Sequence, residues 1–249
     1  KDTTDRNRTS PFAFTGNKFE FRMVGSSQSL SGPNFVLNTI VAETLSEIAD
    51  HLQGAKNVHE TLQALLKTYA TEHEAVIFNG DNYTEAWAKE AEKRGLPNVR
   101  NCVDSINDMI SPENAAVMIK HGTLPQGEIE ARHEILLEHY AKVINIEART
   151  MLNMARRQIL PAIMRFGADV ADGVNALKTA GVNPLAQSRL LKRLNDAVKD
   201  MDQAIDDLTE AVDEAVKKDH ADKKAEAYRD HVVPAMAKLR AVSDHIEPV

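Results

Sequence analysis

Several absences limit what this 249-residue chain is expected to do. It has a single cysteine, Cys102, which excludes an internal disulfide framework. No apolar run approaches the roughly 18 residues that a membrane span needs, and no signal-type apolar segment follows Lys1. We therefore expect a cytoplasmic protein with no membrane partner.

An excess of basic charge is also missing. The chain has 30 Lys and Arg residues against 37 Asp and Glu residues, a formal net charge of −7. Binding to nucleic acid or to anionic lipid requires a basic face, so we expect neither as a partner.

Hydrophobic residues make up 43% of the chain, enough for a real core, and their spacing predicts a mainly α-helical fold. The exception is the N-terminal region, where Phe and Met residues alternate with polar ones. This alternation predicts two short strands, at Phe12–Phe14 and Phe19–Met23, joined at residues 15–17 in a β-hairpin.

The middle of the chain carries clear signals for helix ends. Asn, Ser and Pro residues stand where helices are expected to start, and Gly residues stand just beyond the expected ends. The predicted helices are 35–52 (after Pro33, before Gly54), one starting after Asn57, 84–93 (before Gly95), and one from Pro112 to near Gly122.

The last 120 residues have the strongest periodicity. Apolar residues at 191, 194, 198, 201, 205, 208, 212 and 215, and again from Tyr228 to Ile246, step by three and four after a charged break at 217–224. With a third segment over 127–180, they predict a long antiparallel helical bundle. Pro161 and Pro234 are expected to kink or break their helices.

We expect three regions: residues 1–54 as the end of a larger domain, 55–125 as a connecting region of short helices, and 126–249 as the bundle. The chain starts with Lys and ends at Pro248-Val249 with no helix-closing Gly, so both ends are expected to be cut from a longer sequence.

Most clusters of reactive residues have an ordinary structural explanation. The acidic residues over 200–214 are expected to form a solvated helix surface. His133 and His139 are six residues apart on a helix and point to different faces, so their spacing does not indicate a zinc site. Cys102 has no CxxC partner and is expected to be packed rather than nucleophilic.

The stretch around Lys18, Glu20 and Arg22 is different. On a strand, these three side chains share one face, while Phe19 and Phe21 lie on the other. A carboxylate between two cations suits a divalent metal held beside a phosphate or carboxylate group. The alternative is a solvent-exposed hairpin face with surface salt bridges.

Residues 5–29 resemble a signature of glutamine synthetases, specifically the long-chain type III branch. Asn7-Arg8-Thr9 matches its first part, and Lys18-Phe19-Glu20-Phe21-Arg22 matches its basic-x-Glu-x-Arg part. The stretches IFNGDNYTEAW and GLPNVRNCVDSI, over 77–87 and 95–106, also resemble this branch. The resemblance covers nearly the whole chain and implies that the hairpin is a remnant of the glutamine synthetase catalytic domain.

Glutamine synthetases join ammonia to glutamate at the expense of ATP, through a γ-glutamyl phosphate, with bound Mg²⁺ or Mn²⁺. The resemblance implies that Glu20 is a metal ligand and that Arg22 is catalytic, binding the substrate carboxylate and the transferring phosphoryl group. It implies that Arg8 contacts phosphate and that Lys18 lies near ATP. The sequence departs from the family at Ala13, where a further arginine is usual, and at Lys18, which replaces the usual arginine.

The resemblance places these residues in the C-terminal third of a longer enzyme, whose other metal ligands lie upstream. It implies a homo-oligomer of two rings in the full-length enzyme and no activity for the 249 residues alone, since one glutamate cannot hold several ions. The competing hypothesis is a non-catalytic helical interaction or assembly module with a coiled-coil-like hairpin.

Overall fold

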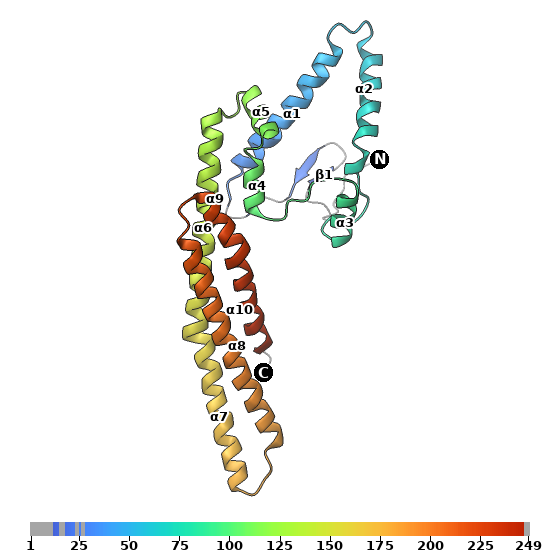
Figure 1. The fold of residues 1–249 in the computed structure, drawn as a ribbon. Helices are drawn as coiled ribbons and strands as arrows, with labels where there is room; N and C mark the ends of the chain where they lie inside the picture. The colour runs from blue at the N-terminus through green and yellow to red at the C-terminus, as the bar shows by residue number, and fades with distance from the viewer. Residues whose placement is uncertain (1–11, 15–17, 23–24, 26–27, 247–249) are drawn as a thin grey trace. The chain divides into compact units, whose positions relative to one another are not determined.

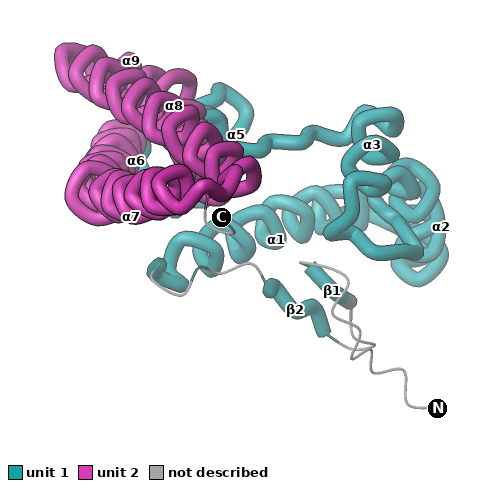
Figure 2. Tube along the Cα trace, turned by 90° about the horizontal axis from the view of Figure 1, so that it is seen from below, with its two compact units in different colours: residues 1–129 teal, residues 130–249 magenta. Residues whose placement is uncertain are grey.

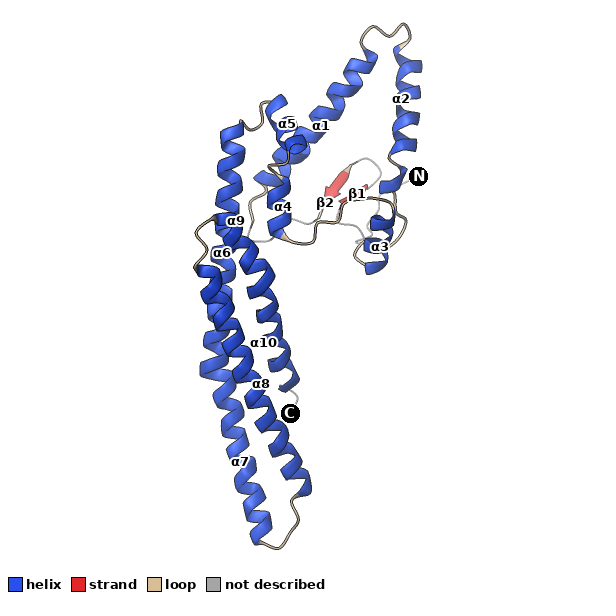
Figure 3. Cartoon of the chain, viewed as in Figure 1, coloured by secondary structure: helices blue, strands red, loops and turns tan. Residues whose placement is uncertain are grey.

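The computed structural model describes residues 12–14, 18–22, 25 and 28–246. The chain divides into two compact units, residues 1–129 and 130–249, which Figure 2 colours separately. In the described residues, one two-stranded sheet precedes a series of helices (Figure 3). The predicted mainly α-helical fold with an N-terminal hairpin is confirmed, whereas the three-region division stays a prediction.

The elements of the first unit follow the sequence signals closely (Figure 1). They are β1 (Phe12–Phe14), β2 (Phe19–Phe21), α1 (Ser31–Leu52), α2 (Val58–Glu72), the 3₁₀ turn η1 (Glu74–Val76), α3 (Glu85–Lys93), α4 (Cys102–Asp108), α5 (Pro112–Lys120) and the start of α6 (Gln126–Met154).

β1 and β2 form the predicted antiparallel hairpin. Phe12 pairs with Phe21, Ala13 with Glu20, and Phe14 with Phe19. The predicted connection at 15–17 and Met23 lie outside the described residues.

Backbone and capping geometry confirm the predicted start of α2 and the predicted end of α1, whereas α1 begins at Ser31, earlier than the predicted residue 35. Asn57 accepts a hydrogen bond from the Glu60 backbone N–H at 3.3 Å, which caps α2. Gly54 follows α1 with φ +78°, a left-handed conformation that residues with a Cβ seldom adopt. Helix α4 was not predicted, although Asn101 caps it by accepting from Asp104 N at 2.9 Å.

Helix α1 is held against α5 by polar contacts. Glu43 Oε2 lies 2.8 Å from Lys120 Nζ and 2.6 Å from His121 Nε2. The hydroxyls of Thr39 and Thr123 are 2.8 Å apart, and Thr39 is the one buried residue of α1. Beside these contacts, a small apolar cluster joins Phe35 to residues of α5, of the α5–α6 connection and of the start of α6, namely Ala115, Met118, Leu124 and Ile129.

The second unit consists of long helices. Its elements are the rest of α6, the π turn η2 (Ala155–Ile159), α7 (Leu160–Thr179), α8 (Leu185–Val216), α9 (Ala221–Ala227), the π turn η3 (Tyr228–Val232) and α10 (Val233–Ile246). Helix α8 packs along both α7 and α10, which confirms the antiparallel bundle. The charged break is shorter than predicted, since α9 already begins at Ala221 and only 217–220 separate it from α8.

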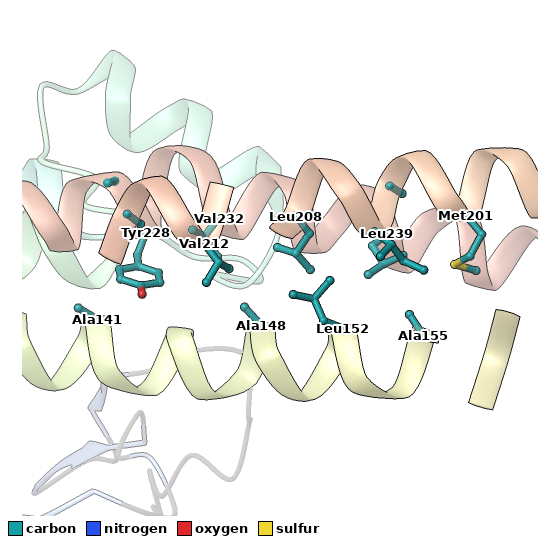
Figure 4. Close-up of a cluster of buried hydrophobic side chains, with 14 of the residues drawn as sticks. Ala141, Ala148, Leu152, Ala155, Met201, Leu208, Val212, Tyr228, Val232 and Leu239 are labelled. Carbon is teal, nitrogen blue, oxygen red and sulfur yellow. The ribbon is translucent and has the colours of Figure 1, made fainter. Parts of the chain in front are cut away.

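In the core of this unit, small side chains of α6 lie opposite larger side chains of the neighbouring helices. Ala141, Ala148 and Ala155 recur every seven residues along α6 and into η2, and each is at most 3% exposed. Figure 4 shows them facing the larger buried side chains of α8, η3 and α10. On α8, six of the eight predicted positions are buried, among them Leu194, Met201, Leu208 and Ala215, while the other two, 191 and 198, are half-buried. Ala204 is also buried, although it was not part of the predicted repeat. The heptad prediction is confirmed.

The two helix prolines are accommodated without a break. Pro161 and Pro234 each stand two residues after a five-residue π turn, η2 and η3 respectively. A proline has no N–H for the carbonyl four residues earlier, and its ring crowds that carbonyl. The wider turn lets carbonyls bond one residue further along, so the helices continue. The prediction allowed a kink or a break, and a break is excluded.

In the described part of the chain, every helix is too short or too polar to cross a membrane.

Candidate functional site

The candidate site is the polar face of the hairpin. Glu20 lies on β2, and Lys18 and Arg22 directly flank this strand; all three alternate with Phe19 and Phe21, so they share the face predicted for them. On β1, Ala13 stands opposite Glu20 and is buried, at 5% exposed.

The three charged side chains are in contact. Arg22 donates to Glu20 Oε2 through both Nε, at 3.3 Å, and Nη2, at 3.0 Å. Lys18 Nζ lies 3.6 Å from the other oxygen, Oε1. The structure thus brings together three of the four predicted site residues, and the fourth, Arg8, lies outside the described residues.

The two cations keep the carboxyl group ionised. Hydrogen bonds from Arg22 hold the pKa of Glu20 below the ordinary glutamate value. The positive charges of Arg22 and Lys18 act in the same direction, while partial desolvation opposes them. At neutral pH, Glu20 is therefore a carboxylate, the form that binds a hard cation.

The opposite face of the hairpin is aromatic and open. The rings of Phe12 and Phe19 stack with centroids 5.1 Å apart, and Phe12 meets Phe21 edge to face at 6.3 Å. The three residues are 48%, 63% and 42% exposed, respectively. Such a face is typical of strands that pack against further protein, because an isolated two-stranded hairpin is marginally stable.

The donor set fits a divalent cation only in part. Glu20 offers one carboxylate, which suits Mg²⁺ or Mn²⁺ as a single oxygen ligand. Among the described residues, no group of three His, Cys, Asp or Glu side chains is placed to hold a metal ion. The remaining ligands would have to come from outside the described residues.

The other sequence candidates have structural explanations. Cys102 is exposed, so the prediction that it is packed is wrong; as the first residue of α4 it points to solvent, and Val103 is buried instead. In the acidic stretch of α8, Asp207 pairs with Lys238 and accepts from Gln203, as expected of a surface.

One polar cluster was not foreseen: Glu43 with Lys120 and His121. Their separations of 77 and 78 residues along the chain leave no local signal by which the pairing could have been found.

The sequence of a part of the helical region matches a known family of domains. The family model of the glutamine synthetase C-terminal domain matches residues 61–178. The type-3 glutamine synthetase of Dictyostelium discoideum is 35% identical over 258 aligned residues, which cover 100% of this chain and 35% of that protein.

Two bacterial proteins agree with this match. The glutamine synthetase of Butyrivibrio fibrisolvens is 35% identical, covering 99% of this chain and 36% of that protein. The glutamine synthetase of Bacteroides fragilis is 31% identical, covering 99% of this chain and 35% of that protein. Residues 61–178 thus match the glutamine synthetase C-terminal domain, and the whole chain is similar to glutamine synthetases, as the resemblance indicated. The chain spans about a third of the length of the curated relatives it matches.

Proposed function

We propose that this chain forms part of a glutamine synthetase, an ATP-dependent ligase that joins ammonia to glutamate through γ-glutamyl phosphate. The observation that carries the proposal is the contact of Lys18, Glu20 and Arg22 on one strand face. The chain around them aligns over its full length with glutamine synthetases. This combination favours a ligase over a purely structural interaction module.

Each residue of the face has a proposed role. Glu20 is an oxygen ligand of Mg²⁺ or Mn²⁺, because it is ionised and its carboxylate is 37% exposed. Arg22 binds the substrate carboxylate and the transferring phosphoryl group. Lys18, 63% exposed, lies near ATP. Arg8 contacts phosphate.

These roles agree with the needs of phosphoryl transfer. That reaction depends mainly on positioning and on neutralising charge on the phosphoryl oxygens. A bound divalent cation supplies such neutralisation, and guanidinium and ammonium groups on the same face add to it. The face contributes one wall of the site, since it offers a single carboxylate.

The similarity to glutamine synthetases also supports a proposal on assembly. We propose a homo-oligomer of two rings and no glutamine formation by residues 1–249 alone. A cytoplasmic location is supported by the single cysteine.

The test compares two proteins: residues 1–249, and the product of the whole reading frame that encodes them. Glutamine formation from glutamate, ammonia and Mg-ATP is expected only for the product of the whole frame. There, Glu20→Gln is expected to lower kcat/KM by about 100-fold or more, the scale on which a lost catalytic electrostatic contact acts.

Glu72→Gln is the matched control, because Glu72 is an exposed carboxylate on α2 and is not part of the face formed by Lys18, Glu20 and Arg22. It is expected to keep normal turnover. Absence of glutamine formation by the product of the whole frame would overturn the proposed activity. Normal turnover of Glu20→Gln at low metal concentration would overturn the role of Glu20 alone.

A further inference from the structure

The two oxygens of the Glu20 carboxylate are held unequally. Oε2 receives two hydrogen bonds from the Arg22 guanidinium, at 3.3 and 3.0 Å. Oε1 faces Lys18 Nζ at 3.6 Å, beyond the range of about 2.7–3.2 Å for an N–H···O bond. One oxygen is therefore fixed, and the other has a looser cationic neighbour.

The two cations also differ in exposure. Arg22 keeps 19% of its side-chain surface exposed, and its planar guanidinium grips Oε2 at two points. Lys18 keeps 63% of its side-chain surface exposed on a flexible stem, and an exposed ion pair such as its contact with Oε1 contributes little to stability. Arg22 is built to stay against the carboxylate, whereas Lys18 can leave it.

A metal ion that binds Glu20 needs an oxygen lone pair with room beside it. Oε2 already accepts two hydrogen bonds, so Oε1 is the oxygen on which an ion can bind. Lys18 stands beside that oxygen, and an ammonium group and a divalent cation repel each other at such range.

We propose that Lys18 is an exchangeable counter-ion of Glu20, which occupies the place of the metal ion next to Oε1 and leaves when the ion binds. Arg22 is then a positioning residue, which keeps Oε2 in place while Oε1 changes partner. This inference rests on the proposed function of Glu20 as a metal ligand.

The first experiment measures Mn²⁺ binding to the product of the whole reading frame, by paramagnetic resonance of free Mn²⁺ and without substrates. Lys18→Met keeps the length of the side chain but removes its charge. It is expected to tighten Mn²⁺ binding by about two- to fivefold, the range of one exposed ion pair. Arg22→Lys is expected to weaken binding, because a single ammonium cannot hold Oε2 at two points.

A second experiment needs no substitution. Acetylation by an N-hydroxysuccinimide ester, followed by peptide mass spectrometry, reports the reactivity of each lysine. Saturating Mn²⁺ is expected to raise the rate at Lys18 by about two- to fivefold, since the ammonium loses its carboxylate partner. Lys67, exposed on α2, is the internal reference and is expected to keep its rate.

The outcomes separate this inference from the proposed function. If Glu20→Gln weakens Mn²⁺ binding while Lys18→Met leaves binding unchanged or weaker, Lys18 is not displaced by the ion, but Glu20 is still a metal ligand. The exchange is equally refuted if Mn²⁺ leaves Lys18 acetylation unchanged in the unsubstituted protein. If Glu20→Gln binds Mn²⁺ normally, the ligand assignment fails, and the exchange fails with it.

Discussion

Glu43 links the helix that follows the candidate site to the helices beyond it. It lies on α1, and its carboxylate contacts Lys120 and His121 at the end of α5. Hydrogen bonds from Lys120 and then from His121 hold the pKa of Glu43 below the ordinary value of 4.5. A carboxyl group with a lowered pKa stabilises the folded state above its ordinary pKa, and this contribution is lost as the pH falls through the lowered value.

We therefore predict that Glu43→Gln loosens the α1–α5 contact at pH 7. Amide hydrogen exchange in α1 and α5 of residues 1–249 is expected to be faster in the variant than in the parent. The difference is expected to shrink as the pH falls below 4.5, because the parent then loses the same charge.

Glu72→Gln is the control, since it removes a carboxylate from the exposed surface of α2. It is expected to leave exchange in α1 and α5 unchanged at both pH values. A Glu43→Gln effect that stays constant down to pH 3 would mean that the charge of Glu43 does not hold these helices together.

For individual residues, contacts set by a local pattern were predictable and contacts between distant parts of the chain were not. The shared face of Lys18, Glu20 and Arg22 follows from the two-residue period of a strand. The exposure of Cys102 was missed because a lone cysteine carries no periodic signal. Glu43 and Lys120 meet only because α1 and α5 pack together, which no local pattern encodes.

The buried alanines of α6 determine how closely the neighbouring helices can pack against it. Ala148 is fully buried within the core of the second unit, where larger side chains face it (Figure 4). Interiors of this density leave no space for three more carbon atoms without displacing neighbours.

We predict that Ala148→Leu destabilises the bundle by about 1–3 kcal/mol, the usual cost of overpacking. Guanidinium unfolding followed by circular dichroism measures it. Ala131→Leu is the matched control on the same helix, because Ala131 is exposed, and it is expected to change stability by less than about 0.5 kcal/mol. Equal effects of the two substitutions would contradict the packing described for α6.

The π turn η2 follows from the spacing of the core residues. Ala141, Ala148 and Ala155 repeat at seven residues, but the next buried residue, Ile163, comes eight residues later. A π turn takes in one extra residue and so keeps Ile163 on the core side. The sequence alone does not show that Ala155 and Ile163 are successive core positions, so the prediction at Pro161 was a kink or a break.

We predict that Pro161→Ala keeps the π turn, because packing of Ile163 requires the extra residue whether or not proline is present. Its crystal structure is expected to show η2 unchanged and Ile163 still buried. A regular α-helix through 155–163, with Ile163 turned toward solvent, would instead make the proline the cause of the turn.

For the whole molecule, the core is distributed unevenly between the two units. Most of the buried apolar residues belong to the second unit, where α8 packs against α7 and α10 along its length. In the first unit, α1 buries one residue and exposes Val36, Ile40, Val41 and Leu45. The heptad repeats predicted the large core of the second unit. No local pattern predicted the exposed apolar side chains of α1, because their exposure depends on what else packs against this helix.

We accordingly predict that a polypeptide of residues 130–249 folds without the rest of the chain. Its 120 residues hold a continuous core, so guanidinium unfolding is expected to be cooperative, with a free energy of about 5–15 kcal/mol. Residues 1–129 are the comparison, and they are expected to unfold at lower denaturant with a broader transition, because their cluster of Ala115, Met118, Leu124 and Ile129 is small. If 130–249 is helical but exchanges its core amides within minutes, the bundle depends on residues 1–129. The two units would then not be independently stable folding units.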